Sequence, residues 1–143
     1  MIFRTATRED LPAVLALLAD GGPSPVTAAH ERAFDAIEAD ARNELLVLAD
    51  GADVLGCLQL TYVPGLGQGG RERALVEAVR VRADRRGAGL GAELMRRATE
   101  RARERGCGLM QLTSNKRRTD AHRFYERLGW ARTHEGFKLR LAD

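Results

Sequence analysis

Apolar and polar positions follow two different periods along this chain of 143 residues. Alternation with a period of two predicts strands, and stripes at spacings of three and four predict helices. In chain order the pattern predicts strand Ile2–Ala6, a helix opened by Thr7, helix Thr27–Ala41, strands Leu45–Ala49, Val54–Val63 and Arg73–Val81, helix Gly89–Arg105, strand Leu109–Thr113, a short helix through Ala121–Leu128, and strands Thr133–His134 and Phe137–Leu141. This order, β-α-α-β-β-β-α-β-α-β-β, predicts a single α/β domain with a mixed (α+β) sheet over residues 1–143.

Composition narrows the class of protein. Apolar residues make up 44% of the chain and charged residues 30%, which is typical of a globular domain. No apolar run approaches the roughly 20 residues of a membrane span, and the N-terminus lacks the apolar stretch of a secretory signal. We therefore expect a cytoplasmic protein without a membrane partner.

The net charge of +3 is carried almost entirely by arginine, because Lys116 and Lys138 are the two lysines of the sequence. Arginine suits bidentate phosphate binding, which fits an anionic cofactor or nucleic acid, although a GC-rich genome also explains most of these arginines. The two cysteines and three histidines have neither disulfide nor metal spacing, and we expect no metal site.

Three glycines crowd into the segment "DRRGAGLGAEL", just ahead of a predicted helix. Gly87-x-Gly89-x-x-Ala92 fits a dinucleotide fingerprint, whereas Arg86-x-x-Gly89-x-Gly91 fits a signature for the pyrophosphate of coenzyme A. A dinucleotide site needs an acidic residue after the next strand, and that strand ends in Leu-Thr-Ser-Asn. The fingerprint also begins too late in the chain for a doubly wound sheet, so the second signature is favoured.

The same segment predicts an anion site on physical grounds. Successive backbone N–H groups can converge where the helix begins, and the helix dipole adds its positive end. Glycines remove the Cβ atoms that would keep a diphosphate away, and Arg86 can add a charge-assisted contact. The alternative is a glycine-rich turn that merely enters a helix, for which one glycine would suffice. The predicted contact residues are Arg86, Gly87, Ala88, Gly89, Leu90, Gly91 and Ala92.

Four motifs together resemble the GNAT family, the GCN5-related N-acetyltransferases. They are Val79-x-Val81, the Arg86–Gly91 segment, Leu112–Asn115 and the run Ala121–Trp130, "AHRFYERLGW". The likeness is dense from Arg73 to Leu141 and rests on element order alone before that. The resemblance implies a GNAT-like acyl-CoA N-acyltransferase fold with a splayed central parallel strand pair, and acetyl-CoA as the acetyl donor.

Glu77 is the unexpected residue of its strand. Regular alternation places Leu75, Glu77, Val79 and Val81 on one face, so we expect a carboxylate in an apolar row. Desolvation would raise its pKa and make it a useful base. The alternatives are a frayed strand end or an ion pair with an arginine such as Arg73 or Arg80. The resemblance favours the general base, because GNAT enzymes often keep a water-linked base at this position.

The resemblance also implies roles for residues that the pattern alone leaves structural. Tyr125 reads as a core aromatic from its helix stripe, but the family's matching Tyr is often the general acid that protonates the thiolate of coenzyme A. Asn115 could shape a turn or cap a helix, and it could also hold the pantetheine arm. That arm would pair with backbone groups of Val79 and Val81, one of which could act as an oxyanion hole.

Three functions compete for the chain. The first is acetylation of a primary amine of a small molecule in a ternary complex, with the acceptor site lined by Gly21–His30, Pro64–Arg71 and His134–Phe137. The second makes the acceptor a protein N-terminus or lysine. The third is a non-enzymatic arginine-rich module, for example for RNA, which the aromatic content of 5% disfavours, so we expect no nucleic-acid partner. The family resemblance makes a homodimer an open expectation.

Overall fold

The computed structural model describes residues 1–22 and 24–143. The chain divides into two compact units, Met1–Gln111 and Leu112–Asp143. The first holds β1 (Ile2–Thr5), α1 (Leu11–Leu18), α2 (Ala28–Ala39), β2 (Asn43–Asp50), β3 (Asp53–Val63), β4 (Arg73–Val81), α3 (Leu90–Arg105) and β5 (Leu109–Gln111), with short 3₁₀ turns at Arg8–Asp10, Gln68–Gly70 and Ala83–Arg85. The second holds α4 (Thr119–Arg127).

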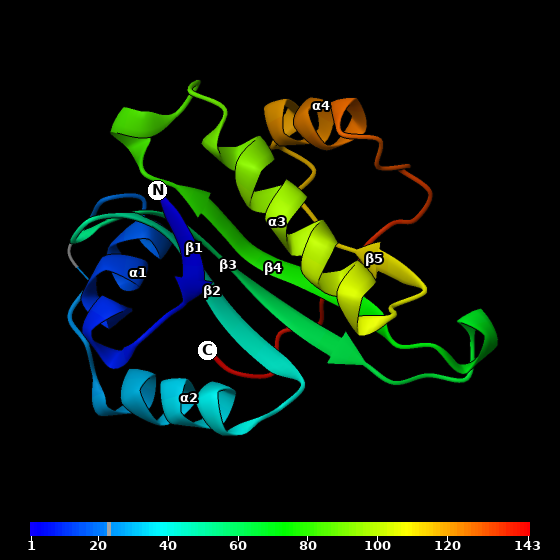
Figure 1. Ribbon diagram of the computed structural model, residues 1–143, viewed down its shortest axis with the longest axis horizontal. Helices are drawn as coiled ribbons and strands as arrows, with labels where there is room; N and C mark the ends of the chain where they lie inside the picture. Colours follow the sequence, from blue (N-terminus) through cyan, green and yellow to red (C-terminus); the bar gives the residue numbers. More distant parts are fainter. Residues whose placement is uncertain (23) are drawn as a thin grey trace. The chain divides into compact units, whose positions relative to one another are not determined.

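The five strands form one mixed sheet in the order β1-β2-β3-β4-β5 (Figure 1). The first three pairings are antiparallel and the last, β4 with β5, is parallel. The parallel pair β4 and β5 needs a crossover connection, which α3 supplies. A tight turn joins β2 to β3, and Gly51 in that turn has a φ of 59°. The mixed α+β class predicted from the pattern is confirmed.

The two C-terminal strands predicted at Thr133–His134 and Phe137–Leu141 are wrong. Within the described residues the chain beyond α4 forms neither helix nor strand. Phe137, Leu139 and Leu141 are 92%, 85% and 91% exposed, so the alternation with Lys138 and Arg140 is present but nothing covers it. The reason is that a strand is defined by main-chain pairing with a neighbour, and a period of two in one segment does not supply the neighbour.

Different helices pack against the opposite faces of the sheet. Cys57 of β3 lies in the hydrophobic cluster that α1 and α2 make with the sheet. Gly56 points to the other face, where a Cβ would meet Leu94 Cδ1 of α3 at 2.8 Å. Glycine therefore allows the close approach of α3 to β3. Burial raises the pKa of the Cys57 thiol to about 11, so Cys57 serves as a small buried apolar side chain.

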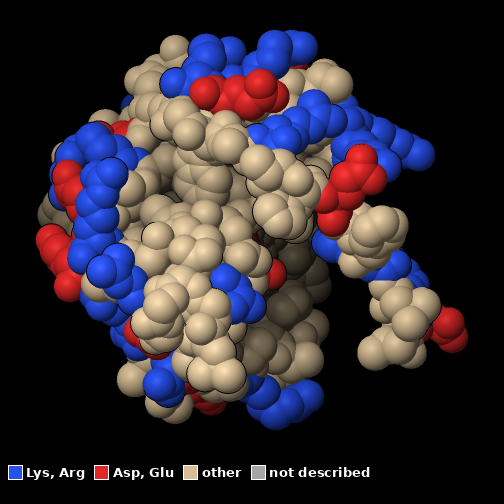
Figure 2. Space-filling model, turned by 90° about the vertical axis from the view of Figure 1, so that its right-hand side faces the viewer, with Lys and Arg blue, Asp and Glu red and all other residues tan. Residues whose placement is uncertain are grey.

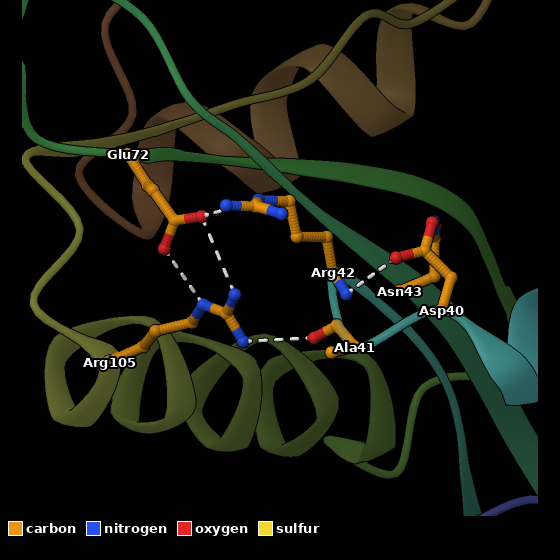
Figure 3. Close-up of polar contacts among 6 residues, drawn as sticks. All are labelled: Asp40, Ala41, Arg42, Asn43, Glu72 and Arg105. Atoms are coloured by element: carbon orange, nitrogen blue, oxygen red, sulfur yellow. Dashed lines mark hydrogen bonds and ion pairs between the residues drawn. The ribbon is translucent and has the colours of Figure 1, made fainter.

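Helix α3 is held in place by a buried apolar face and by polar contacts near its C-terminal end. Its apolar stripe of Leu90, Leu94, Ala98 and Ala102 is buried. Near its C-terminal end, Glu72 accepts hydrogen bonds from Arg105 at 2.9 Å and from Arg42 at 3.2 Å, and Arg105 also donates to the Ala41 carbonyl (Figure 3). These contacts join α3 to the starts of β2 and β4.

A second polar cluster lies one turn earlier on α3. Glu44 of β2 accepts from the Tyr62 hydroxyl at 2.6 Å and from Arg101 at 2.8 and 3.2 Å. The Arg105 guanidinium lies 4.0 Å above the Tyr62 ring. The hydrogen bonds from Arg101 lower the pKa of Glu44, and burial together with the Glu44 contact raises the pKa of Tyr62.

We expect Glu44→Gln to destabilise the fold by about 1–2 kcal/mol at pH 7, because a charge-assisted contact becomes a neutral one. The pKa of Glu44 is lowered by folding, so its stabilisation is complete above about pH 4.5 and is lost as the pH falls through the folded pKa. Urea unfolding should show the difference between wild type and variant shrinking below pH 4.5. Glu100→Gln, at an exposed pair with Arg96, is the matched control and should cost less than about 0.5 kcal/mol. A constant Glu44→Gln deficit at pH 3 would contradict this assignment.

Candidate functional site

The candidate site begins where β4 loses its parallel neighbour. Pairing with β5 covers Arg73–Leu75, and β4 continues to Val81 with no partner from β5. Arg82 donates its backbone N–H to the Leu55 carbonyl of β3 at 2.8 Å. Since alternate residues turn their peptide groups to alternate edges, Val81 and Val79 present theirs to the open edge. The open edge of β4 thus lies at the residues that the sequence selected, where β5 has already ended at Gln111.

A β-bulge at Ala78 changes the faces of β4. Gln59 pairs with Glu77 and Cys57 with Arg80, so the one residue between the partners on β3 lies opposite two residues, Ala78 and Val79, on β4. Ala78 has a φ of 55°, a left-handed conformation that few non-glycine residues adopt. The predicted shared face of Glu77 and Val81 is therefore wrong, because their partners Gln59 and Gly56 point to opposite faces.

The expected environment of Glu77 is wrong for the same reason. Glu77 is exposed instead of lying in an apolar row, and Arg80, a candidate ion-pair partner, donates to the Val79 carbonyl at 2.9 Å. Sequence alternation carried no sign of the bulge, since "RALVEAVRV" reads as a regular strand. The carboxylate is therefore open to solvent.

The glycine loop ahead of α3 has the geometry of an anion site. Gly87 and Gly89 adopt φ values of 81° and 82°, and Leu90 is buried at 6% exposure and anchors the helix start. Among the described residues, none supplies a hydrogen-bond acceptor to the backbone N–H groups from Gly87 to Ala92. A Cβ at Gly87 or Gly89 would meet no atom within 4 Å. Unpaired donors, open space and the helix dipole fit a diphosphate.

Arginine side chains donate hydrogen bonds to backbone carbonyl groups along the open edge of β4. Besides the Arg80 contact to Val79, Arg86 donates from Nε to the Val81 carbonyl at 3.3 Å. The Nη2 atom of Arg86 also lies 3.7 Å from Asp20 Oδ1, in the turn after α1. Sequence reasoning missed Asp20 and considered Arg80 only as a partner of Glu77, since neither lies in a recognisable motif and their contacts depend on the fold.

In the second unit, Asn115 shapes the approach to α4. Its Oδ1 accepts from the Arg117 backbone N–H at 2.9 Å, and its carbonyl oxygen lies 2.9 Å from His122 Nε2. The turn-forming alternative is therefore observed. The neighbouring Ser114 Oγ is enclosed and has no hydrogen-bond partner in the part of the chain that the structure describes.

Tyr125 lies on α4 among aromatic rings. The ring of Phe124 lies 5.1 Å away and that of Trp130 lies 6.1 Å away, both edge-on. The Tyr125 carbonyl accepts the backbone N–H of Trp130 at 3.0 Å, which fixes the chain just after α4, around Gly129 with its φ of 96°. Phe124 and Tyr125 are half-buried, and Leu128 is 40% exposed, so the predicted stripe of α4 is only partly covered.

The predicted acceptor segments lie in both units. Gly21–His30 and Pro64–Arg71 belong to the first, and His134–Phe137 belongs to the second. Pro23 lies outside the described residues. Leu66, in the second segment, is 99% exposed.

Charges are mixed over the surface, and arginines are accompanied by acids. Figure 2 shows Lys and Arg side chains interspersed with Asp and Glu on the face it presents. Arg82, for example, pairs with Asp84 at 2.7 Å. Residues 1–22 and 24–143 contain no cluster of three His, Cys, Asp or Glu side chains that could hold a metal ion. They also contain no helix with the length and apolar character needed to span a membrane.

Residues 11–130, which include the open β4 edge, the glycine loop and α4, match the acetyltransferase (GNAT) family. The chain belongs to this family. The sequence resemblance, drawn from the motifs between Val79 and Trp130, is confirmed, and the match extends into the N-terminal half, where element order alone supported it.

Two named acetyltransferases are similar to this chain over different lengths. Streptothricin acetyltransferase of Streptomyces lavendulae is 33% identical over 122 residues, covering 85% of this chain and 59% of the relative. Aminoalkylphosphonate N-acetyltransferase of Salmonella typhimurium is 43% identical over 56 residues, covering 39% of this chain and 36% of the relative. The matched region is thus less than two thirds of either relative.

A solved structure shares nearly the whole architecture. The crystal structure of a protein described as a transcriptional regulator from Bacillus halodurans C-125 superposes with a TM-score of 0.94 at 42% identity, covering 98% of this chain and 99% of that one. Agreement over this length supports the mixed-sheet GNAT architecture for the chain as a whole.

Proposed function

We propose that this GNAT protein is an N-acetyltransferase that moves the acetyl group of acetyl-CoA to a primary amine of a small molecule, by direct attack in a ternary complex. The observation that carries the proposal is the row of unpaired backbone N–H groups from Gly87 to Ala92 at the start of α3. That row follows a few residues after the open edge of β4. One chain segment, from Val79 to Ala92, therefore offers both a main-chain pairing site and an anion site. The proposal treats residues 1–143 as a single acetyltransferase domain.

Each end of coenzyme A has a proposed set of partners. The diphosphate would bind the N–H groups of Gly87 to Ala92 and the Arg86 guanidinium. The pantetheine arm would pair with the backbone of Val79 and Val81, as an added strand does, and would meet Asn115.

Two side chains carry the proton transfers in this proposal. Bound acetyl-CoA supplies an activated thioester carbonyl. The amine nitrogen forms the new bond to that carbonyl carbon, the carbon–sulfur bond breaks, and the ammonium proton passes to Glu77 directly or through water. The Tyr125 phenol donates its proton to the departing sulfur, and one N–H group of Val79 or Val81 stabilises the developing oxyanion.

A small-molecule acceptor is supported by the relatives. Both carry names that specify small amines, streptothricin in one case and aminoalkylphosphonates in the other. A protein N-terminus or lysine is the competing acceptor, and a peptide substrate in the same assay separates the two.

The test measures binding first and turnover second. Calorimetry should show coenzyme A binding to the protein, and thiol release from acetyl-CoA should appear with members of a panel of small amines, including aminoalkylphosphonates. Peptides with free N-termini or lysines should give less turnover than the best small amine. Failure to bind coenzyme A overturns the proposal, and turnover with peptides alone overturns the acceptor class.

A further inference from the structure

Arg86 has two partners that belong to different parts of the first unit. Its Nε–H donates to the Val81 carbonyl at the end of β4, and its Nη2 atom lies 3.7 Å from Asp20 Oδ1 in the turn after α1. The two side chains of this ion pair are 57% and 73% exposed. An exposed pair at that distance is weak and readily exchanged.

Both partners matter to the proposed coenzyme A site. The Val81 carbonyl faces the open edge where the pantetheine arm would pair. Asp20 lies immediately before Gly21–His30, one of the predicted acceptor segments. A diphosphate at the start of α3 would attract the same guanidinium, because a charge-assisted, bidentate contact to phosphate is stronger than either existing contact.

We propose that Arg86 exchanges partners when coenzyme A binds: the diphosphate takes the guanidinium from Asp20 and from the Val81 carbonyl. The exchange exposes that carbonyl to the pantetheine arm and releases the turn after α1 from the glycine loop. Asp20 is then a competitor of the diphosphate and acts on coenzyme A through Arg86. This inference rests on the proposed function and adds a link between the cofactor site and an acceptor segment.

Two variants have opposite expected effects on two ligands. Asp20→Asn removes the competing charge and should tighten coenzyme A binding roughly two- to fivefold, leaving acetylpantetheine, which lacks the diphosphate, unchanged. Arg86→Ala should weaken coenzyme A roughly tenfold or more and should tighten acetylpantetheine up to about threefold, since the Val81 carbonyl is no longer covered. A purely structural role for Arg86 would weaken both ligands in parallel.

Calorimetry at low salt on the full chain gives the dissociation constant of each ligand for the wild type and for each variant. Asp84→Asn is the matched control, because it removes the same charge from an exposed pair that involves Arg82 and not Arg86, and it should leave coenzyme A binding unchanged. In the Arg86→Ala background, Asp20→Asn should have no effect. The proposal is overturned if Asp20→Asn weakens or does not change coenzyme A binding, if Asp84→Asn gives the same gain, or if Arg86→Ala weakens acetylpantetheine as well.

These failures are distinct from failure of the proposed function. Wild-type protein that does not bind coenzyme A overturns both. Wild-type protein that binds coenzyme A, with Asp20→Asn binding it equally well, overturns the exchange alone and leaves the acetyltransferase proposal standing.

Discussion

Replacing Gly89 with aspartate is expected to weaken coenzyme A binding roughly 100-fold relative to asparagine at the same position. Gly89 is the residue before α3 and has a φ of 82°, a conformation that both Asp and Asn tolerate better than other side chains. The two variants therefore share the backbone strain and differ by one negative charge. That charge would stand at the proposed diphosphate site, where one pair of like charges about 4 Å apart costs up to about 4 kcal/mol at an effective dielectric constant of 20.

Stability separates this effect from misfolding. An acidic residue before a helix favours the helix dipole, so the aspartate variant should unfold at the same urea concentration as the asparagine variant or higher. Binding is measured by calorimetry at two salt concentrations, and the difference between the variants should shrink as salt screens the repulsion. Equal affinities for coenzyme A in the two variants would show that the diphosphate does not lie at the start of α3.

Loss of the proposed proton-transfer groups is expected to lower turnover roughly 100-fold or more while leaving coenzyme A binding within about twofold. Tyr125→Phe keeps the ring between Phe124 and Trp130 and removes the hydroxyl. Glu77→Gln is isosteric at an exposed position, so the fold should be unaffected. The two changes thus test chemistry with little disturbance of packing.

The pH dependence of kcat distinguishes the two roles. Glu77→Gln should remove the acidic limb of the profile, because the base is no longer present, and Tyr125→Phe should remove the basic limb. Glu38→Gln, an exposed carboxylate on α2, is the control for the charge change and should leave kcat unchanged. Full turnover in both Glu77→Gln and Tyr125→Phe would show that the chemical assignments are wrong while the family membership stands.

Most of the first unit could be predicted from the sequence. The strand Arg73–Val81 and the buried stripe of α3 are found as expected, because burial of one helix stripe is a local pattern. The glycine loop could also be predicted from the sequence, since it depends on glycine's freedom at positive φ and on the helix start, both of which are local properties.

Other features depend on contacts that no local pattern contains. The bulge at Ala78 exists because one residue of β3 lies opposite two residues of β4, and it puts Glu77 and Val81 on opposite faces. The predicted strands at Thr133–His134 and Phe137–Leu141 fail because pairing partners are a property of the fold. The contact of Arg86 with Asp20 joins residues far apart in the chain.

The sequence by itself therefore determined the family, through its motifs. It also determined the mixed sheet and the glycine loop before α3, because periodicity, glycine positions and helix starts are encoded within a few residues. The tertiary structure alone decided which side chains face the site and which contacts they make. Strand register and cross-chain pairing set those orientations, and a shift of one residue in register reverses the face of every side chain that follows it. That is why the sequence placed Glu77 correctly on its strand but did not predict its exposure. It is also why the contact of Asp20 with Arg86 could be seen only in the structure.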